Sequence, residues 1–293
     1  MNRHHSIAVI GLGIMGGAMS ANLVKSGFAV RGFDVLDARR RQLKKAGGIA
    51  ARDIGDAVAG VPFVITSLPS SAALLDVARE IAARGVPRQI VMDTSTVPIA
   101  IKEQARDLLA ARGVTLLDCP LSGTGAQAKV RDLSVYASGP RAACRKCVAV
   151  FEGFARTHFY LGTFGTGSKM KFLANLLVAI HNVSAAEAVL LAERAGLDPM
   201  LAVKVLGDGA GASRMLQVRG PMMARGRYSP ATMSVGMWQK DMGIIGAFAR
   251  NLEAPTPLFD VAAAIYDAAM KQGLAESDTA AVHAVLRQLA KGK

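Results

Sequence analysis

The stretch that decides the fold lies near the start of the chain, where an apolar run enters a glycine-rich turn: Ser6-Ile7-Ala8-Val9-Ile10-Gly11-Leu12-Gly13-Ile14-Met15-Gly16. Gly11 permits a tight turn, Gly13 lets the backbone approach a pyrophosphate, and Gly16 lets the next helix pack closely on a sheet. The N-terminus of that helix offers N–H groups and partial positive charge to phosphate oxygens. The stretch therefore predicts a strand–turn–helix unit that binds a dinucleotide, with cofactor contacts from Gly11, Leu12, Gly13, Ile14, Met15 and Gly16.

An acidic residue after the next strand-like run supports this interpretation. Asp34 follows residues 29–33, and a carboxylate at that position accepts hydrogen bonds from both ribose hydroxyls of an adenosine. Because a carboxylate repels a 2′-phosphate, Asp34 favours NAD over NADP. The basic run Arg39-Arg40-Arg41 follows, and NADP becomes tolerable if these side chains curl back. We therefore predict NAD as the cofactor, with NADP possible.

Length and composition indicate a folded protein of one large or two smaller domains. The chain has 293 residues, 51% of them hydrophobic, and its three cysteines do not make a disulfide framework. No apolar run approaches the ~18 residues of a membrane span, and a strand that begins by residue 6 leaves no place for a signal peptide. These features predict a cytoplasmic protein without a membrane partner.

The net charge of +13 raises the possibility of nucleic-acid binding. Aromatic residues make up only 5% of the chain, however, so platforms on which bases could stack are scarce. We interpret the basic surface as a solvated face that attracts an anionic cofactor and substrate, and we expect no nucleic-acid partner.

The first half of the chain alternates strand-like and helical segments, which is typical of a doubly wound, mainly parallel sheet. The expected strands are 6–10, 29–33, 61–67, 89–93, 114–118, 133–137 and 157–161, and the expected helices include 15–26, 71–84 and 98–112. Ligands of such sheets bind beyond the carboxyl ends of the strands, where we expect the polar segments that follow them to converge. The prediction is an α/β dinucleotide-binding domain of the Rossmann type over residues 1–164.

Beyond residue 164 helical periodicity replaces the strands. We expect helices over 168–195, 233–251, 257–272 and 277–290, with a partly irregular segment over 209–231. Gly196 is a predicted C-cap, and Asp198-Pro199 a predicted start of the next helix. Residues 165–293 are therefore predicted to form an all-helical domain.

Several residues have the chemistry of an active site, each with a plainer alternative. Lys171 and Asn175 share one helix face, and Lys171 is either a general acid/base or a surface charge. Lys240-Asp241 is a second candidate or a local charge pair. The loop at residues 122–125 presents a hydroxyl and N–H groups suited to a carboxylate, or is an ordinary loop. Cys144 and Cys147 have the spacing of half a zinc site without a second pair, so no metal is expected.

Six motifs in order give the chain a resemblance to the β-hydroxyacid dehydrogenase family, which includes 3-hydroxyisobutyrate dehydrogenases, tartronate semialdehyde reductases and L-threonate dehydrogenases. The family's G-x-G-x-M-G and leucine–proline elements match residues 11–16 and Leu68-Pro69. Its D-x-S-T-x-x-P element is similar to residues 93–98, where the proline comes one position earlier. Its D-x-P-x-S-G-G-x-x-x-A, G-x-G-x-x-x-K-x-x-N-N and K-D elements are similar to residues 118–128, residues 165–175 and Lys240-Asp241.

The resemblance implies reversible hydride transfer between NAD(P) and a small β-hydroxy acid, with a role for each matched residue. Lys171 would be the catalytic acid/base and Asn175 would support it at the substrate. The loop of Ser122, Gly123 and Thr124 would hold the substrate carboxylate. The cofactor contacts would be completed by Leu68, Pro69, Thr96 and Lys240. Relatives are usually dimers or tetramers, which implies a homo-oligomer.

The chain departs from the family pattern at three positions, one of which is Ala73 in the cofactor loop, where some members have asparagine. Thr124 replaces the last glycine of the S-G-G element, and Ala174 replaces the first asparagine of the paired set. These changes affect the expected substrate more than the reaction class. Imine-reducing relatives replace the catalytic lysine, which this chain keeps. The alternatives are a non-catalytic NAD(H)-binding redox sensor and an imine or semialdehyde reductase of the same fold.

Overall fold

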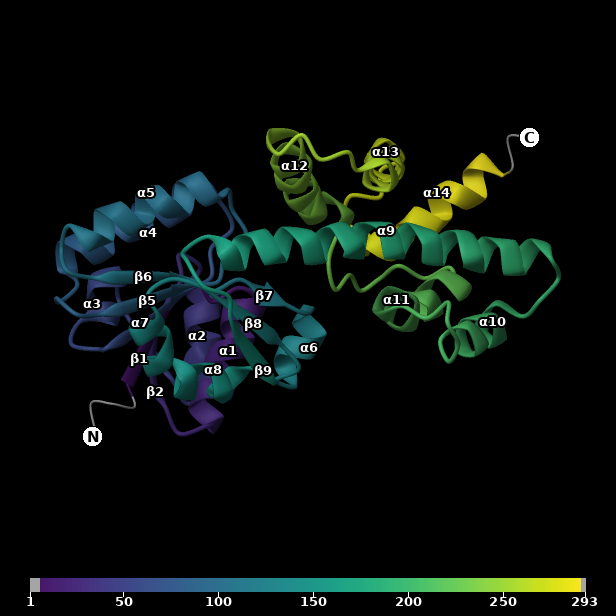
Figure 1. Ribbon diagram of the computed structural model, residues 1–293. Helices are drawn as coiled ribbons and strands as arrows, with labels where there is room; N and C mark the ends of the chain where they lie inside the picture. Colours follow the sequence, from purple (N-terminus) through teal and green to yellow (C-terminus); the bar gives the residue numbers. More distant parts are fainter. Residues whose placement is uncertain (1–5, 291–293) are drawn as a thin grey trace. The chain divides into compact units, whose positions relative to one another are not determined.

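The computed structural model describes residues 6–290. The chain divides into two compact units, Met1–Lys171 and Phe172–Lys293. The boundary predicted between residues 164 and 165 lies just before helix α9 (Thr166–Arg194), whose first turns belong to the first unit and whose remainder belongs to the second. Figure 1 shows the elements in sequence colours.

The first unit is built on a six-stranded sheet in the order β3-β2-β1-β4-β5-β6. Its strands are β1 (Ser6–Ile10), β2 (Ala29–Phe33), β3 (Ile49–Ala50), β4 (Phe63–Thr66), β5 (Ile90–Asp93) and β6 (Thr115–Asp118). Every neighbouring pair is parallel. The order reverses between β1 and β4, which is the switch point where ligands of such sheets bind. The predicted doubly wound parallel sheet is confirmed.

Helices cover both faces of this sheet because its strands are apolar on both sides. In β1, Ile7 and Val9 belong to one buried cluster, whereas Ala8 and Ile10 belong to the other. The first cluster includes residues of α1 (Ile14–Lys25), α2 (Asp37–Lys45) and α8 (Val148–Phe154). The second includes residues of α3 (Ile54–Val58), α4 (Ser71–Arg84) and α5 (Ile99–Ala110). Strands buried on both faces read as continuous apolar runs.

The later predicted strands form a separate small sheet rather than extending the first. Its order is β7-β8-β9, with β7 (Leu121–Ser122) antiparallel to β8 (Ser134–Ala137) and β8 parallel to β9 (Thr157–Tyr160). Helices α6 (Gly125–Lys129) and α7 (Arg141–Lys146) connect or flank these strands. The two-residue strands β3 and β7 are too short to produce a sequence pattern, and sequence reasoning missed both.

The second unit is helical, as predicted. After α9 it contains α10 (Pro199–Leu206), α11 (Arg214–Ala224), α12 (Val235–Asn251), α13 (Pro257–Lys271), the short 3-10 helix η2 (Thr279–Ala281) and α14 (Val282–Leu289). Asp198 caps α10 by accepting hydrogen bonds from the N–H groups of Met200 and Leu201. The segment predicted to be partly irregular, 209–231, contains α11.

Helix α9 is long and apolar enough to cross a membrane by length and composition, with a mean hydropathy of 1.5 over its best window. The sequence expectation counted uninterrupted apolar runs and so did not single it out. The core helix of a folded protein passes the same test. In the second unit, buried Asn182 of α9 donates to the Tyr266 hydroxyl at 2.9 Å and to the Thr279 carbonyl at 2.8 Å, which attaches α9 to α13 and η2.

Candidate active site

The glycine turn after β1 has a geometry that only glycine allows. Gly11 has a φ of 88°, and a Cβ atom there would lie 2.3 Å from the carbonyl oxygen of Ser67. A Cβ atom at Gly16 would lie 1.9 Å from the carbonyl oxygen of Gly11. Real atoms do not approach this closely, so both glycines are required for the turn and for the packing of α1 on the sheet.

The N-terminus of α1 fits the diphosphate of a dinucleotide. Gly13 is the N-cap residue, no side chain caps it within the described part of the chain, and the first turn contains no acidic residue. Ile14, the first residue of the helix, is 60% exposed. The first N–H groups of a helix lack intrahelical acceptors and carry about half a positive charge in sum. These donors suit an anion, and their contact with the cofactor stays a prediction.

Asp34 lies at the end of β2 with its carboxylate against this turn. Its Oδ2 accepts a hydrogen bond from the N–H of Leu12 at 2.8 Å, and its Oδ1 accepts one from Leu36 at 2.8 Å. Nη1 of Arg39 is 3.2 Å from Oδ2. A carboxylate accepts about four hydrogen bonds, so the three contacts leave capacity for a ribose hydroxyl. Asp34 therefore also fixes the turn, a role that sequence reasoning did not foresee.

Two of the three consecutive arginines turn back toward Asp34. In addition to the Arg39 contact, Arg40 donates from Nη1 to the Asp34 carbonyl oxygen at 2.8 Å, and its guanidinium lies 5.5 Å from the centre of the Phe33 ring. Arg41 instead pairs with Asp37 on its own helix. The condition under which the sequence analysis allowed NADP, arginines that curl back, is thus met.

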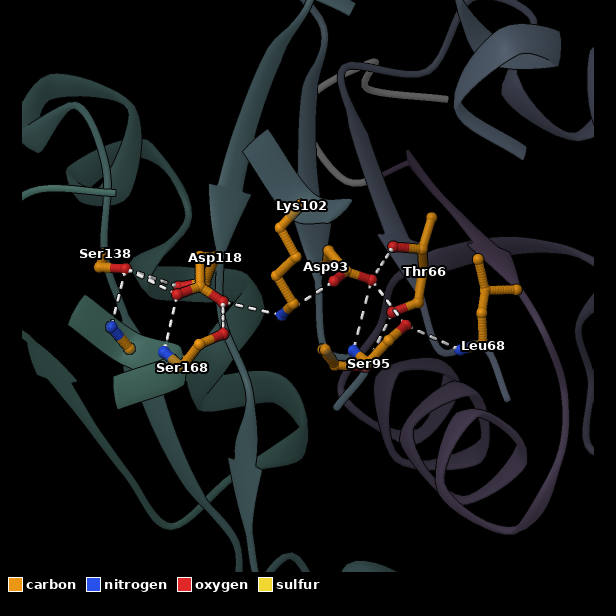
Figure 2. Close-up of polar contacts among 10 residues, drawn as sticks. Thr66, Leu68, Asp93, Ser95, Lys102, Asp118, Ser138 and Ser168 are labelled. Carbon is orange, nitrogen blue, oxygen red and sulfur yellow. Dashed lines mark hydrogen bonds and ion pairs between the residues drawn. The ribbon is translucent and has the colours of Figure 1, made fainter. Parts of the chain in front are cut away.

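The loop after β4 is held by a buried polar network, drawn on the right of Figure 2. Oδ1 of Asp93, at the end of β5, accepts hydrogen bonds of 2.7 Å from the hydroxyls of Thr66 and Ser95. The Ser95 hydroxyl in turn accepts the N–H of Leu68 at 3.0 Å. Asp93 therefore determines where Leu68 lies, and with it the predicted cofactor contact at Pro69. Thr96 follows Ser95 on the same loop and is half-buried.

The beginning of α9 is held by the end of β6, as the left of Figure 2 shows. Oδ2 of Asp118 accepts the N–H of Ser168 at 2.7 Å, and Oδ1 accepts its hydroxyl at 2.8 Å. Ser138 accepts the N–H of Gly167 at 3.0 Å and donates to Asp118 Oδ2 at 3.1 Å. A Cβ atom at Gly167 would lie 2.3 Å from the Tyr136 carbonyl oxygen, which explains the glycine of the G-x-G motif.

The side chain of Lys102 (α5) joins the contacts of Asp93 to those of Asp118. Its Nζ is 2.8 Å from Oδ1 of Asp118 and 2.9 Å from Oδ2 of Asp93, and all three side chains are fully buried. Burial alone would lower the pKa of Lys102, but the charges of Asp118 and Asp93 outweigh it and raise the pKa above its usual value. Lys102 therefore carries its positive charge in the interior.

Sequence reasoning missed Lys102, although the helix pattern contains a signal. Lys102, Ala105 and Leu109 are the buried positions of α5, spaced as one helix face. A lysine on the apolar face of a helix that packs on a sheet needs an anionic partner there. Asp93 and Asp118, at the ends of two adjacent strands, are the acids that the alternating pattern places at that edge.

The predicted substrate loop begins at the end of β7. Ser122 is half-buried and Gly123 is exposed with a φ of 135°. Thr124 is the N-cap of α6: its N–H donates to Oε1 of Gln127 at 3.0 Å, and its hydroxyl accepts the Gln127 N–H. Thr124 therefore has a capping role that sequence reasoning did not foresee, and its contact with substrate stays a prediction.

Helix α6 brings this loop against the glycine turn. A Cβ atom at Gly125 would lie 2.4 Å from Cγ2 of Ile14, and Asn22 of α1 donates to the carbonyl oxygen of Ala128 at 2.7 Å. The predicted cofactor turn and substrate loop are thus neighbours within the first unit.

Lys171 lies one turn after Ser168 on α9 and is half-buried. It belongs to the first unit, with the glycine turn, Asp34, Leu68 and the substrate loop. Asn175 and Lys240 belong to the second unit.

In the second unit, Asn175 is buried and donates from Nδ2 to Oδ2 of Asp241 at 3.0 Å. Nζ of Lys240 lies 3.6 Å from Oδ1 of the same aspartate. Asp241 is thus a shared partner of two predicted site residues, and the sequence analysis gave it no role beyond its pairing with Lys240.

Comparisons with known proteins concern the family and the fold of the chain. The model of the NAD binding domain of 6-phosphogluconate dehydrogenase matches residues 6–162, and that of the NAD-binding region of NADP-dependent 3-hydroxyisobutyrate dehydrogenase matches residues 165–286. An L-threonate dehydrogenase of Cupriavidus necator is 32% identical over 281 residues, which cover 94% of each chain. An NAD-dependent L-serine dehydrogenase of Pseudomonas aeruginosa is 30% identical, over 94% of this chain and 96% of that protein.

Among solved structures, a 3-hydroxyisobutyrate dehydrogenase from Salmonella typhimurium superposes with a TM-score of 0.87 at 28% identity. The match covers 96% of this chain and 99% of that one. Fold, glycine turn and family matches together define an NAD(P)-dependent dehydrogenase. The chain belongs to the β-hydroxyacid dehydrogenase family, as its motifs predicted.

Proposed function

We propose that the protein reversibly oxidises a small β-hydroxy acid, with Lys171 as the general acid/base. The observation that carries the proposal is the anchoring of α9. Asp118 and Ser138 hold the first turn of α9 at the carboxyl ends of the strands, where the glycine turn also lies. Lys171 follows one turn later, on a backbone that these contacts make rigid. A rigid support of this kind is what an acid/base group needs.

Lys171 would move one proton to or from the substrate. In the oxidative direction its neutral amine takes the hydroxyl proton, and in the reductive direction its ammonium protonates the oxygen of the carbonyl group that is reduced. The nicotinamide, when bound, supplies the hydride acceptor or donor. A well-placed acid/base accelerates such reactions by about 10²–10⁴-fold.

The substrate carboxylate would bind at Ser122 and Gly123. The Ser122 hydroxyl is a suitable donor, and the loop lies beside the glycine turn through the Gly125–Ile14 contact. We propose a 3-hydroxyisobutyrate-, threonate- or tartronate semialdehyde-like substrate. The relatives named for L-threonate, L-serine and 3-hydroxyisobutyrate support acids of this size. Thr124 in place of the family's glycine would adjust the choice among them.

For the cofactor we propose that NAD is preferred and NADP is also used. Asp34 keeps spare hydrogen-bonding capacity for a ribose. Arg39 lies beside that carboxylate, and its Nη1 is 3.7 Å from the ideal Cβ position of Gly13. A guanidinium in that place would offset part of the repulsion between Asp34 and a 2′-phosphate.

We also propose a cytoplasmic homo-oligomer. Apolar side chains of α10 in the second unit, Leu201 and Val205, are 58% and 62% exposed in the single chain, and association would cover them. Light scattering coupled to size-exclusion chromatography should give a mass of at least twice 30.6 kDa. A single-chain mass at micromolar concentration would contradict the oligomer.

A substrate screen tests the reaction itself. Absorbance at 340 nm is followed with NAD and with NADP against small β-hydroxy acids, and against acids that lack the hydroxyl as controls. We expect NADH formation with at least one hydroxy acid. Binding of NADH without turnover of any acid, or of any semialdehyde in the reverse direction, would instead favour a redox sensor.

A further inference from the structure

Lys102 is a buried cation between two buried carboxylates, and its neighbours lead to both sides of the proposed site. On one side, Asp93 accepts the Ser95 hydroxyl, and Ser95 accepts the N–H of Leu68. On the other, Asp118 accepts both the N–H and the hydroxyl of Ser168. Figure 2 shows this chain of contacts running across the ends of β4, β5, β6 and the start of α9.

Stability alone does not explain an ion cluster in this place. Well-packed apolar residues are often as stabilising as a buried ion pair, because the charges must lose their hydration. What the ammonium adds is position: Nζ of Lys102 donates a hydrogen bond to Oδ1 of Asp118 and forms a close ion pair with Oδ2 of Asp93, so one charge holds both carboxylates beside it. Oδ2 of Asp93 is buried, and no hydrogen bond of good geometry reaches it from the described residues, so its ion pair with Lys102 compensates its charge.

We propose that Lys102 is a positioning residue that couples the cofactor loop at Leu68 to the first turn of the helix that carries Lys171. The proposal rests on the roles proposed above for Leu68 and Lys171. Without the ammonium, Asp93 and Asp118 repel each other in the interior, or one of them takes up a proton. A protonated or displaced Asp118 holds Ser168 less firmly. The side chain of Lys171, one turn later on α9, is then no longer fixed in its position. A misplacement of about 1 Å in a reacting group lowers rates by about 10²-fold.

Substitutions at the centre, at each end and outside the network test this coupling. Lys102→Met removes the charge and keeps the length, whereas Ser168→Ala and Ser95→Ala each remove one hydroxyl at one end. Ser184→Ala is the matched control, because Ser184 lies on the exposed face of α9 and bonds only to the carbonyl oxygen of His181 among the contacts described. The measurements are kcat, KM, the Kd for NADH by fluorescence, and amide hydrogen exchange of the cofactor-free protein.

We expect Lys102→Met to lower kcat by at least about tenfold with a smaller change in KM for the acid. Amide exchange should become faster both at residues 66–70 and at residues 165–172. Ser168→Ala should change only the second segment and lower kcat a few fold, and Ser95→Ala should change the first segment and weaken NADH binding. Ser184→Ala should change neither segment.

The double variant Lys102→Met/Ser168→Ala decides whether the two residues act as a unit. If Lys102 acts on α9 through Asp118 and Ser168, the double variant loses little more kcat than Lys102→Met alone. Losses that multiply would show independent effects and overturn the proposal. So would an unchanged kcat in Lys102→Met.

A second variant keeps the test decisive if Lys102→Met does not fold. Asp93→Asn keeps the volume and leaves Lys102 with Asp118, and no contact links Asp93 directly to α9 in the described network. The proposal predicts faster exchange at residues 165–172 in this variant, and a change confined to residues 66–70 would overturn it.

Failure of the coupling is distinguishable from failure of the proposed function. The exchange measurements need no cofactor and do not depend on the role of Lys171. Coupled exchange together with an active Lys171→Ala variant would reject the acid/base role and leave the coupling standing. An inactive Lys171→Ala variant together with a fully active Lys102→Met variant would support the acid/base role and reject the coupling.

Discussion

At the scale of single residues, Asp34 and Arg39 illustrate how one contact alters a cofactor prediction. Sequence spacing identifies the acid and shows that basic residues follow it. Only the structure shows that Arg39 reaches the Asp34 carboxylate, at 3.2 Å. The pair presents both charges where the adenosine ribose is expected, so the balance between NAD and NADP should depend on Arg39 as well as on Asp34.

Removal of the arginine should therefore sharpen the preference for NAD. In Arg39→Ala we expect kcat/KM for NADP to fall by about tenfold, which corresponds to about 1.4 kcal/mol, with a smaller change for NAD. Asp34→Asn should act in the opposite direction and narrow the gap between the cofactors. Steady-state kinetics with both cofactors provide the measurement. Equal losses for NAD and NADP in Arg39→Ala would show that this guanidinium does not face the 2′ position.

The substrate loop makes a separate prediction. Ser122→Ala should raise KM for the acid by about tenfold, the effect of losing one hydrogen bond to a charged group, about 1.5 kcal/mol. NADH binding should stay nearly unchanged, because cofactor and carboxylate use different loops. Fluorescence titration with NADH is the control measurement. Equal weakening of both ligands would assign Ser122 to the cofactor or to the fold.

At the scale of elements, the beginning of α9 depends on the absence of a side chain at Gly167. Gly167→Ala should reduce the free energy of unfolding by about 1–3 kcal/mol, as overpacking does, and should lower kcat because Lys171 follows on the same helix. Gly243→Ala is the matched control: Gly243 lies in α12, and nothing lies within 4 Å of its ideal Cβ position. In this control the free energy of unfolding should rise by about 0.5–1 kcal/mol. Denaturant unfolding measures both, and equal stability of the two variants would contradict the close approach of α9 to Tyr136.

The sequence predicts the regular elements of the fold but not the side-chain contacts between them. Long apolar runs and the glycine turn predicted the parallel sheet and the helices that flank it. The network around Lys102 was not predicted, because it joins segments that are apart in the chain: Lys102 pairs with Asp93 and Asp118, and Asp118 accepts the Ser168 hydroxyl. The capping box of Thr124 was also missed, although a threonine followed three residues later by glutamine is a known sequence signature.

At the scale of the whole molecule, the division into a sheet unit and a helical unit follows from the change of periodicity near residue 164. The substrate does not follow from either unit, because pocket shape depends on side chains of loops that carry no periodic pattern. The long helix α9 contains residues of both units, and its buried Ser168, Asn175 and Asn182 are each hydrogen-bonded within the protein. Buried polar side chains with partners inside the protein are typical of a helix that packs against other protein segments.

The helical unit should lose stability in mild acid because of His283. Burial lowers the pKa of His283; Glu193 opposes this shift and Arg287 adds to it, so the folded-state pKa lies below its ordinary value. The unfolded chain then takes up the proton first, and stability falls as the pH drops below about 6.5. Each unit of difference between the two pKa values corresponds to about 1.4 kcal/mol.

Thermal unfolding between pH 7.5 and 5.5 tests this expectation. His283→Gln removes the titrating group and should flatten the pH dependence in that range, while it loses the 3.0 Å contact with the Tyr228 hydroxyl. His181→Gln, on the half-exposed surface of α9, is the control and should keep the wild-type slope. An unchanged slope in His283→Gln would assign the acid sensitivity to other groups.

Substitution of Lys171 provides the decisive test of its proposed role as the acid/base of a hydride-transferring enzyme. Lys171→Ala removes the proton carrier, and Lys171→Arg keeps a positive charge on a group that does not release its proton at working pH. Lys169→Ala, an exposed lysine two residues earlier on α9, is the control. The measurement is kcat for oxidation across pH, with NADH binding followed in parallel.

We predict that both Lys171 variants bind NADH and lose kcat by at least about 10²-fold, whereas Lys169→Ala stays active. The rise of the wild-type rate with pH should be absent from the residual activity of Lys171→Ala. Near-normal turnover in Lys171→Ala, with the wild-type pH profile, would show that Lys171 does not transfer the proton.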